Sequence, residues 1–495
     1  MSPLLGRGWV LPYWLEQQID PASSAFVTGD SRARNLSGRN WTLLGAVGSS
    51  RRGVVDPRGL VVPSLGRPSV DWWVRSNDRW HFPSRGDEVH QRLVDQAPVV
   101  ETILQVDGGE VIHRAFVAGG ADEHIVVEIQ NNTETAIAVA LCARPYDHES
   151  QVRCDEVRFD NGSLLVDGAA LISPERDPGQ VLTSNQKHGD VAESLDDPRV
   201  SSVSSQCVNG LAQGALVFPL VEGATLRARV EFEEVTQRSP APYEAVASGW
   251  TKHVDSGLRL TLPEGTLSEL VEANRRSLHL FDANAEIFSD PMSGPGLARA
   301  EMFIISALQS YGFTEVAAEA LLTRCDAISR DGSFADSLGE LSATGAVLGA
   351  LGDQYRLTRD VAFARATTAA VTSAAAWIES QRRKQRKSAS ELTMGLMPPG
   401  PSPREEGKRT RYLDNFWSLR GLRDAALLLE VAGESDASSS VRAAAADLRV
   451  DLLDSLESVV AAGATEAIPS GPDRIVDEAA IESLSAAWPC EVLRF

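Results

Sequence analysis

Cysteine is scarce in this chain, and its few cysteines do not form a metal-binding or disulfide pattern. They are odd in number and scattered, and no two of them are spaced as Cys-x-x-Cys: Cys142, Cys154, Cys207, Cys325 and Cys490. This distribution is typical of structural thiols in a reducing compartment and disfavours a zinc site or a disulfide framework.

The short motifs of several common enzyme classes are also missing. The sequence has no His-Glu-x-x-His, no Gly-x-Ser-x-Gly, no P-loop and no Gly-x-Gly-x-x-Gly. All of its histidines precede residue 280, so the second half offers no histidine base to a nucleophilic serine. We therefore expect neither serine-hydrolase chemistry nor nucleotide binding, and we expect no metal and no cofactor.

Long apolar runs and net positive charge are absent as well. No apolar run approaches the ~18 residues of a membrane span, and the first twenty residues lack the pattern of a signal peptide. The net charge of -21 disfavours binding to nucleic acid or to an anionic membrane, because phosphate would be repelled. We therefore expect a cytoplasmic protein with no nucleic-acid partner and no membrane association.

Residues 39–235 alternate apolar and polar side chains, as half-buried strands do. Every second side chain from Leu226 to Phe232 is apolar, while Arg227, Arg229 and Glu231 lie between them. Short turn signals such as Asp-Gly and Asn-Gly separate about ten such segments. The pattern predicts an antiparallel β-sandwich, and we assign residues 1–250 to this domain.

After residue 258 the period becomes that of Ala-rich helices. Tight links such as Tyr-Gly-Phe-Thr alternate with long loops, and in a ring of helical hairpins this alternation places every long loop at the same end. We therefore predict a helical-hairpin domain over residues 251–495. An ordinary helical domain with irregular loops is the alternative.

The long loop from Pro398 to Trp417, which is rich in charged and aromatic residues, is the strongest candidate site. Compact domains rarely carry a loop of this length without a function. It holds three carboxylates, a basic cluster and aromatic rings, among them the candidates Glu405, Glu406, Asp414, Lys408, Arg409, Arg411, Tyr412 and Trp417. We interpret it as part of a sugar-binding rim, and the alternative is a solvated charged loop.

Several short motifs support the sugar interpretation through a family resemblance. They are Asp331-Gly332-Ser333-Phe334, Ala343-Thr344-Gly345, Gly395 to Pro399, Tyr412 to Trp417, Ile468-Pro469-Ser470, Asp56 to Val61 and Ser69 to Trp73. With the order of strands then helices, they resemble bacterial glucoamylases and related inverting glycoside hydrolases (family fifteen and its phosphorylase relatives). The resemblance implies an N-terminal super-sandwich, an (α/α)6 barrel and a carbohydrate substrate such as an α-glucoside or an oligosaccharide.

The resemblance also implies roles for the acidic residues. Inverting hydrolysis needs a protonated acid and a carboxylate base roughly 6.5–9.5 Å apart. The acid is expected in the loop that contains Glu405 and Glu406, and the sequence does not choose between them. Asp414 is a third candidate acid or a ligand for a sugar hydroxyl, although it also suits the N-cap of the following helix. The basic neighbours would hold these acids ionised, which is unsuited to a general acid, and Asn415 stands where relatives carry another acidic residue.

Aromatic and acidic residues elsewhere are candidate sugar ligands. Asp331 and Phe334 lie on the preceding long loop, and Asp331-Gly332 also suits a plain turn. Indole rings stack on sugar rings, so Trp72, Trp73 and Trp80 are candidates, with core packing as the alternative for each.

The helical domain is predicted to be an incomplete barrel. We expect about eight helices before Phe495, fewer than the six hairpins of the related barrels. Glu478 and Glu482 are then weak substitutes for the general base, and a homo-oligomer is one way to cover the open face.

Three functions remain open from the sequence. The first is inverting hydrolysis of an α-glucoside or oligosaccharide. The second is a catalytically impaired carbohydrate-binding or scaffolding relative. The third is a sugar phosphorylase with Lys408, Arg409 and Arg411 as its anion site.

Overall fold

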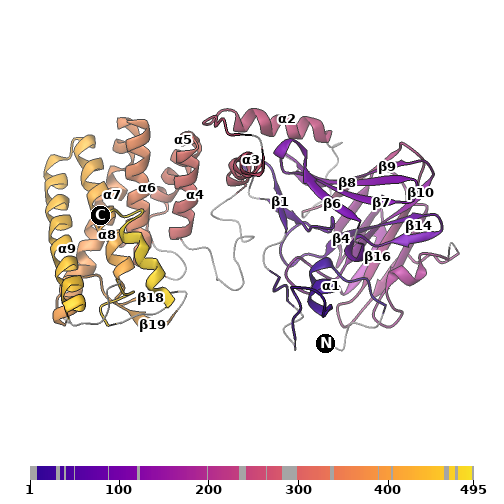
Figure 1. The fold of residues 1–495 in the computed structure, drawn as a ribbon, viewed down its shortest axis with the longest axis horizontal. Helices are drawn as coiled ribbons and strands as arrows, with labels where there is room; N and C mark the ends of the chain where they lie inside the picture. Colours follow the sequence, from indigo (N-terminus) through magenta and orange to yellow (C-terminus); the bar gives the residue numbers. More distant parts are fainter. Residues whose placement is uncertain are drawn as a thin grey trace. The chain divides into compact units, whose positions relative to one another are not determined.

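The computed structural model describes most of the chain, and two compact units emerge from it. The described residues are 8–28, 34–37, 41–49, 51–86, 88–119, 123–197, 199–232, 241–263, 265–280, 298–334, 339–387, 390–402, 405–461, 468–473 and 478–492. One unit, called the β unit here, comprises Met1–Asp255 and Leu260–Ile287; the helical unit comprises Ser256–Arg259 and Phe288–Phe495 (Figure 1).

The β unit contains two large antiparallel sheets. The first has the order β1 (Thr42–Gly45), β2 (Arg52–Val55), β3 (Val61–Val62), β4 (Ser69–Ser76), β10 (Ile137–Arg144), β16 (Gln213–Leu220) and β14 (Gln180–Ser184), with β5 (Arg79–His81) paired to β4. The second has the order β15 (Ser204–Gln206), β11 (Glu156–Asp160), β12 (Ser163–Val166), β13 (Ala169–Pro174), β17 (Thr225–Val230), β9 (His124–Thr133), β8 (Gly109–Ala118), β7 (Val99–Val106) and β6 (Val89–Leu93).

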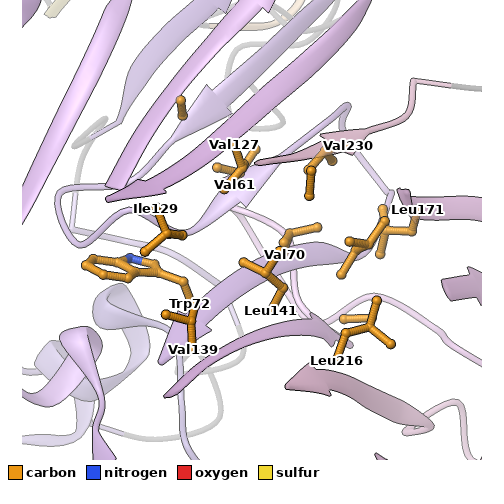
Figure 2. Close-up of a cluster of buried hydrophobic side chains, with 14 of the residues drawn as sticks. Val61, Val70, Trp72, Val127, Ile129, Val139, Leu141, Leu171, Leu216 and Val230 are labelled. Carbon is orange, nitrogen blue, oxygen red and sulfur yellow. The ribbon is translucent and has the colours of Figure 1, made fainter. Parts of the chain in front are cut away.

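Alternating side chains explain why these segments form a sandwich. In β17, Leu226, Ala228 and Val230 are buried, whereas Arg227 on the opposite face pairs with Glu128 of β9 at 2.7 Å. Figure 2 shows buried side chains of both sheets pointing toward one another, among them Trp72 of β4 and Ile129 of β9. Burying each such side chain stabilises the fold by about 1.5–3 kcal/mol, so the shared apolar layer holds the sheets together.

Several helices complete the β unit. They are α1 (Tyr13–Ile19), α2 (Tyr243–Val254), α3 (Thr266–Leu278) and the 3-10 turns η2 (Pro83–Arg85), η3 (Val94–Gln96) and η4 (Val191–Ser194). The end of α3 is fixed to the first sheet, because Arg52 of β2 donates from Nε to the carbonyl of Leu280 at 2.6 Å.

The described part of the helical unit contains three helical hairpins. They are α4 (Ala298–Ser310) with α5 (Thr314–Asp326), α6 (Ser342–Thr358) with α7 (Val361–Gln385), and α8 (Tyr412–Ala432) with α9 (Ser435–Ala461) (Figure 1). Shorter elements are η6 (Glu391–Thr393), η7 (Glu478–Ala486) and the two-stranded hairpin β18 (Gly400–Ser402) and β19 (Glu405–Arg409). The prediction of an antiparallel β domain followed by an incomplete array of helical hairpins is confirmed, since the described helices are fewer than those of a full (α/α)6 barrel.

Helices α4, α6 and α8 pack side by side, with α6 between the other two. Glycine permits the closest approach: a Cβ at Gly345 of α6 would collide with the backbone of Trp417 of α8. The N-termini of α6 and α8 meet, because Asp414 accepts the backbone N–H of Ser342 at 3.0 Å. The loops before these two helices therefore lie at the same end, as the alternation of short and long links predicts.

Helix α7 is long and apolar enough to cross a membrane by length and composition alone. Half of its most apolar window is buried within the protein, where it packs mainly against α8. Helix packing therefore accounts for its apolar side chains.

Candidate functional site

A cluster of charged side chains lies where α6 and α8 begin. Arg411 contacts Asp414 at 3.0 Å and Glu340 at 3.5 Å, and Glu482 of η7 lies 3.9 Å away. Arg299 of α4 reaches the same two glutamates at 3.5 and 3.8 Å. We call these five residues the carboxylate cluster. All five side chains are at least 86% buried, so three carboxylates are held by two guanidinium groups largely out of contact with water.

Arg411 joins the three carboxylates, and the pKa of one of them, Asp414, is shifted by its surroundings. Burial raises its pKa to about 6, the positive charge of Arg411 opposes the rise, and the negative charge of Glu340 adds to it. Burial thus outweighs the pairing with Arg411 in setting the direction of the shift, although a pKa of about 6 still leaves most Asp414 side chains ionised at neutral pH.

Asp414 also caps a different helix from the one predicted. Arg411 occupies the N-cap position of α8, and Asp414 lies within the first turn. Its Oδ1 instead accepts the N–H of Ser342, the first residue of α6. The N-cap interpretation for α8 is wrong, and Asp414 joins the starts of two neighbouring helices.

Of the other predicted acids, Glu405 and Glu406 belong to β19, and Glu478 is the first residue of η7. The backbone of Glu405 pairs with Ser402 in the β18–β19 hairpin, so part of the predicted loop is a small sheet. The side chains of Glu405, Glu406 and Glu478 lie outside the described residues, and their roles stay predictions. Lys408 is exposed, and Arg409 reaches Asp473 at 3.5 Å.

Asn415 anchors the loop that precedes α8. Its Oδ1 accepts the N–H of Met397 at 2.8 Å, and its Nδ2 donates to the carbonyl of Arg411 at 2.8 Å. A carboxylate could accept the first bond but could not donate the second. The amide at this position, where the resemblance leads one to expect an acid, is explained by this structural role.

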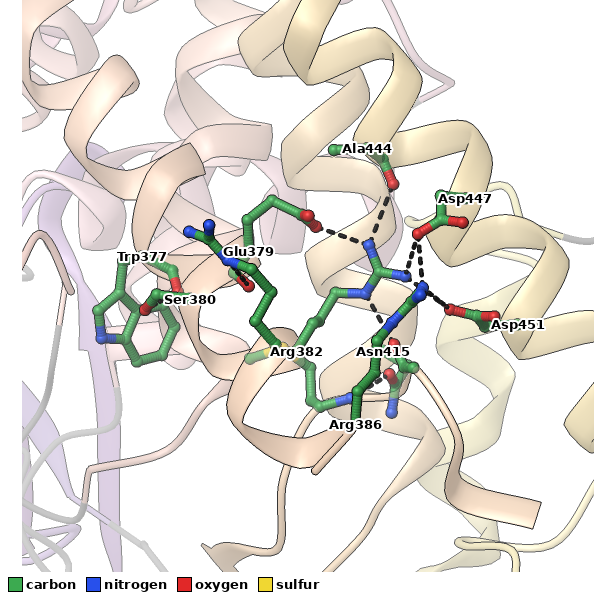
Figure 3. Close-up of polar contacts among 12 residues, drawn as sticks. Trp377, Glu379, Ser380, Arg382, Arg386, Asn415, Ala444, Asp447 and Asp451 are labelled. Atoms are coloured by element: carbon green, nitrogen blue, oxygen red, sulfur yellow. Dashed lines mark hydrogen bonds and ion pairs between the residues drawn. The ribbon is translucent and has the colours of Figure 1, made fainter. Parts of the chain in front are cut away.

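A buried arginine fixes the same loop from the other side, as Figure 3 shows. Arg382 of α7 donates from Nε to the carbonyl of Gly395 at 2.7 Å and pairs with Asp447 and Asp451 of α9 at 3.2 and 2.8 Å. Its side chain is only 1% exposed, whereas Arg386, which contacts the same two aspartates, is 41% exposed. The loop is thus held by α7, α8 and α9 together.

An aromatic pocket of about 310 Å³ lies between α4, α6, α8 and the segment after η7. Its aromatic wall is formed by Phe303, Trp417 and Trp488, with ring centroids of Phe303 6.0 Å from Trp417 and 5.9 Å from Trp488. Trp488 is 68% exposed, while Trp417 is buried. Among the described residues, the Nε1–H of Trp417 has no hydrogen-bond partner.

Polar side chains also line this pocket. Arg420 of α8 pairs with Asp353 of α6, and Arg356 contacts the same carboxylate at 3.0 Å. Asp424 pairs with both arginines. The pocket therefore combines stacking surfaces with fixed hydrogen-bond donors and acceptors.

The carboxylate cluster and the aromatic pocket are neighbours along the same helices. Trp417 follows Asp414 by three residues in α8, and Phe303 follows Arg299 by four residues in α4, so each pair shares one helix face. One turn of helix separates the two features by about 5 Å along the helix axis.

The remaining predicted ligands have structural contacts of their own. Oδ1 of Asp331 accepts the backbone N–H and the hydroxyl of Ser333 at 3.0 and 2.7 Å, which lowers its pKa and matches the plain-turn alternative. Phe334 is 2% exposed, and Tyr412 is fully buried with its hydroxyl 2.9 Å from that of Ser455.

Trp72 and Trp73 likewise belong to the core. Both are fully buried; Trp72 stacks on His113, and Trp73 donates to Asp71 at 2.9 Å. Core packing, the alternative interpretation, describes both residues, and neither ring is accessible to a ligand.

Sequence patterns gave no signal for three of the residues that shape the site. Glu340, Arg299 and Phe303 lie far from residues 398–417 in the sequence and reach the site only through helix packing. In the described ranges, no group of three or more His, Cys, Asp or Glu residues is arranged to hold a metal ion.

Comparison with solved structures defines the class of fold. A bacterial glucoamylase complexed with acarbose is similar with a TM-score of 0.54 and 11% identity, over 82% of this chain and 66% of that chain. Two matches have lower TM-scores. One is a family GH92 α-mannosidase from Bacteroides thetaiotaomicron, with a TM-score of 0.44, 11% identity and coverage of 89% and 62%. The other is a family GH92 inverting mannosidase from the same organism, with a TM-score of 0.35, 11% identity and coverage of 83% and 60%.

The protein therefore has a fold of the six-hairpin glycosidase type with an N-terminal β domain. No family model and no curated protein sequence matches it. The chain spans about 60–66% of the length of these three structures. At this level of identity the similarity shows the fold alone.

Proposed function

We propose that this protein binds a carbohydrate in the aromatic pocket of its helical unit. The observation that carries the proposal is the pair of rings on the pocket wall, Phe303 and Trp488, whose centroids lie 5.9 Å apart. Trp488 is 68% exposed, so a ligand can reach its ring, whereas the Nε1 of Trp417 is buried.

The rest of the pocket supports the same ligand class. The apolar face of a sugar ring packs on aromatic rings, here Phe303 and Trp488, and its hydroxyls need donors and acceptors such as Arg420 and Asp353. A volume of about 310 Å³ lies at the lower end of the range for small-molecule sites. The pocket thus suits one end of an oligosaccharide, and the glucoamylase of similar fold was crystallised with acarbose.

Calorimetric titration of the full chain with a panel of α-glucosides tests this proposal. Trp488→Ala removes an exposed ring of the pocket and is expected to weaken binding about tenfold, which corresponds to about 1.4 kcal/mol. Leu484→Ala is the matched control, because Leu484 is an equally exposed apolar side chain (69%) on the neighbouring η7. Equal affinities of both variants and the unmodified chain would contradict the proposal.

Inverting hydrolysis is the second candidate function, and the state of Asp414 favours it. With a pKa raised to about 6, Asp414 retains a proton in part of the molecules near neutral pH. A proton delivered to the glycosidic oxygen releases the leaving group, while a second carboxylate takes a proton from the attacking water. Glu340 and Glu482 adjoin Asp414, and Glu405 and Glu406 remain candidate acids by resemblance.

The geometry around Asp414 sets the condition for such catalysis. Arg411 and the N–H of Ser342 occupy its oxygens, and its side chain is fully buried. A substrate would have to displace the pairing with Arg411 before it could receive the proton. This is why binding, rather than turnover, is the function that the described residues support best.

Product analysis separates the candidate functions. Release of free sugar that is lost in Asp414→Asn but kept in Asp331→Asn would support hydrolysis through Asp414. Release of a sugar phosphate only when inorganic phosphate is present would support a phosphorylase, with Lys408 and Arg409 as candidate anion ligands. Saturable binding without either product would support the function of a carbohydrate-binding protein.

A further inference from the structure

A second cavity lies entirely within the β unit, at an edge of the sandwich. It has a volume of about 640 Å³ and is lined by residues within 76–88 and by the end of β7 with its following turn, residues 104–107. Strand β5 belongs to the first sheet and β6 to the second, so the chain passes from one sheet to the other beside this cavity. We call it the sheet-edge groove.

The groove has an aromatic wall that is held in place by the core. Trp80 is half-buried, and its Nε1 donates to Asp196 at 3.0 Å, which fixes the orientation of the indole. Phe82 is also half-buried and packs edge-on against the fully buried Trp73, with ring centroids 5.2 Å apart. Both rings are therefore preorganised for stacking and would lose little conformational freedom on binding.

The rest of the groove is rich in groups that donate or accept hydrogen bonds. Gln105 and Asp107 are exposed at the end of β7, and Asn77 contacts Asp107 across the groove at 3.5 Å. Ser76 is 2% exposed, and its hydroxyl has no partner among the described residues. The exposed amide and carboxylate groups are therefore the ones that a ligand can reach.

The charges in the groove balance one another. The lining includes two basic residues, Arg79 and Arg85, and two acidic residues, Glu88 and Asp107, so neither an anionic nor a cationic ligand is favoured. His81 has a pKa lowered by burial and by the charge of Arg79. At neutral pH its uncharged ring both donates and accepts, as binding to hydroxyl groups requires.

We propose that the sheet-edge groove is a second carbohydrate-binding site that takes a neutral oligosaccharide. Flat aromatic surfaces bind the apolar faces of sugar rings, and the amide and hydroxyl groups bind their hydroxyls. The groove is about twice as large as the aromatic pocket, so it offers room for several sugar units. This site needs no catalytic residue and does not depend on the site proposed in the helical unit.

Fluorine NMR of the full chain labelled with 5-fluorotryptophan tests the proposal residue by residue. The chain has 10 tryptophans, and Trp80→Phe identifies the signal of Trp80. The probes are maltohexaose, cellohexaose and mannohexaose at millimolar concentration. We expect the Trp80 signal to shift saturably with at least one of them, while the signals of the buried Trp72 and Trp73 change less.

Two glutamine variants show whether binding involves the groove itself. Gln105→Ala removes a lining amide and is expected to weaken the Trp80 response about tenfold. Gln206→Ala is the matched control, because each glutamine is exposed on a strand and donates to a neighbouring glutamate, at 3.2 Å for Gln105 and 3.3 Å for Gln206. The control is expected to bind as the unmodified chain does.

The same spectra separate this proposal from the one on the helical unit. If the Trp80 signal does not shift with any of the three sugars, the sheet-edge site is overturned, whether or not the Trp488 signal shifts. A saturable Trp80 response with an unchanged Trp488 signal would support the groove and count against the aromatic pocket. Equal weakening by Gln105→Ala and Gln206→Ala would also overturn the groove as the binding site.

Discussion

Asp414→Asn is expected to change how the stability of the protein depends on pH. Burial raises the pKa of Asp414 from 3.8 to about 6, so between these values the folded state binds more protons than the unfolded state. The contribution of Asp414 to stability is therefore greatest below the lower pKa and is lost as the pH rises through the higher one. Asparagine has a similar shape but does not titrate, so it lacks this dependence.

The size of the effect follows from the two pKa values. The full shift corresponds to about 3 kcal/mol, and about 2 kcal/mol of this is expected between about pH 4.5 and about pH 7.5. As the pH rises across this range, the free energy of unfolding of the variant should therefore increase by about 2 kcal/mol relative to that of the unmodified protein.

Urea unfolding followed by circular dichroism at 222 nm measures this difference, because the helical unit dominates the signal. The comparison of variant with unmodified protein at each pH cancels the titration of groups that both chains share. Asp331→Asn is the control, since the pKa of Asp331 is lowered rather than raised and the side chain is exposed. A stability difference for Asp414→Asn that stays constant with pH would refute the assignment of a raised pKa to this residue.

Two further pairs of substitutions test the packing that positions the site. Gly345→Ala should destabilise the helical unit by about 1–3 kcal/mol in thermal unfolding, because its Cβ would collide with α8. Gly249→Ala is the control, because Gly249 lies in α2 and no neighbouring atom is within 4 Å of the added Cβ. This variant should stabilise the protein by about 0.5–1 kcal/mol. Destabilisation by both substitutions would contradict this reasoning. Arg382→Lys should lower the free energy of unfolding by about 3 kcal/mol, because lysine cannot form the branched set of bonds to the loop and to α9. Arg386→Lys, at the exposed position, should lower it by less than about 1 kcal/mol. Equal costs in urea unfolding would show that burial of the guanidinium does not matter.

Local patterns in the sequence were sufficient to predict the order and type of most elements. The two-residue period identified strands such as β17, and the change of period after residue 258 indicated the Ala-rich helices, of which α7 is one. These features depend on neighbouring residues along the chain, where sequence carries direct information. The β18–β19 hairpin was missed because two short strands inside a loop rich in proline and glycine have no clear period.

The candidate site was harder to predict because burial and long-range contacts decide it. Trp72 and Trp80 look alike in the sequence, yet one is fully buried and the other lines a groove. Asp414 was identified as a candidate acid, but its bond to Ser342 and its contact with Glu340 depend on how α6 packs against α8. Side-chain chemistry was therefore predictable, whereas its accessibility and its partners were not.

The strand order of the β unit has a consequence for how the chain folds. Strand β4 pairs with β10, and β9 pairs with β17, so segments far apart in the sequence must meet before either sheet is complete. Each helical hairpin, by contrast, joins consecutive helices. Because folding slows as contacts become more distant in sequence, the sheets are expected to limit the rate at which the whole chain reaches its native state. During synthesis, the first half of the chain cannot close its second sheet until β17 has been made.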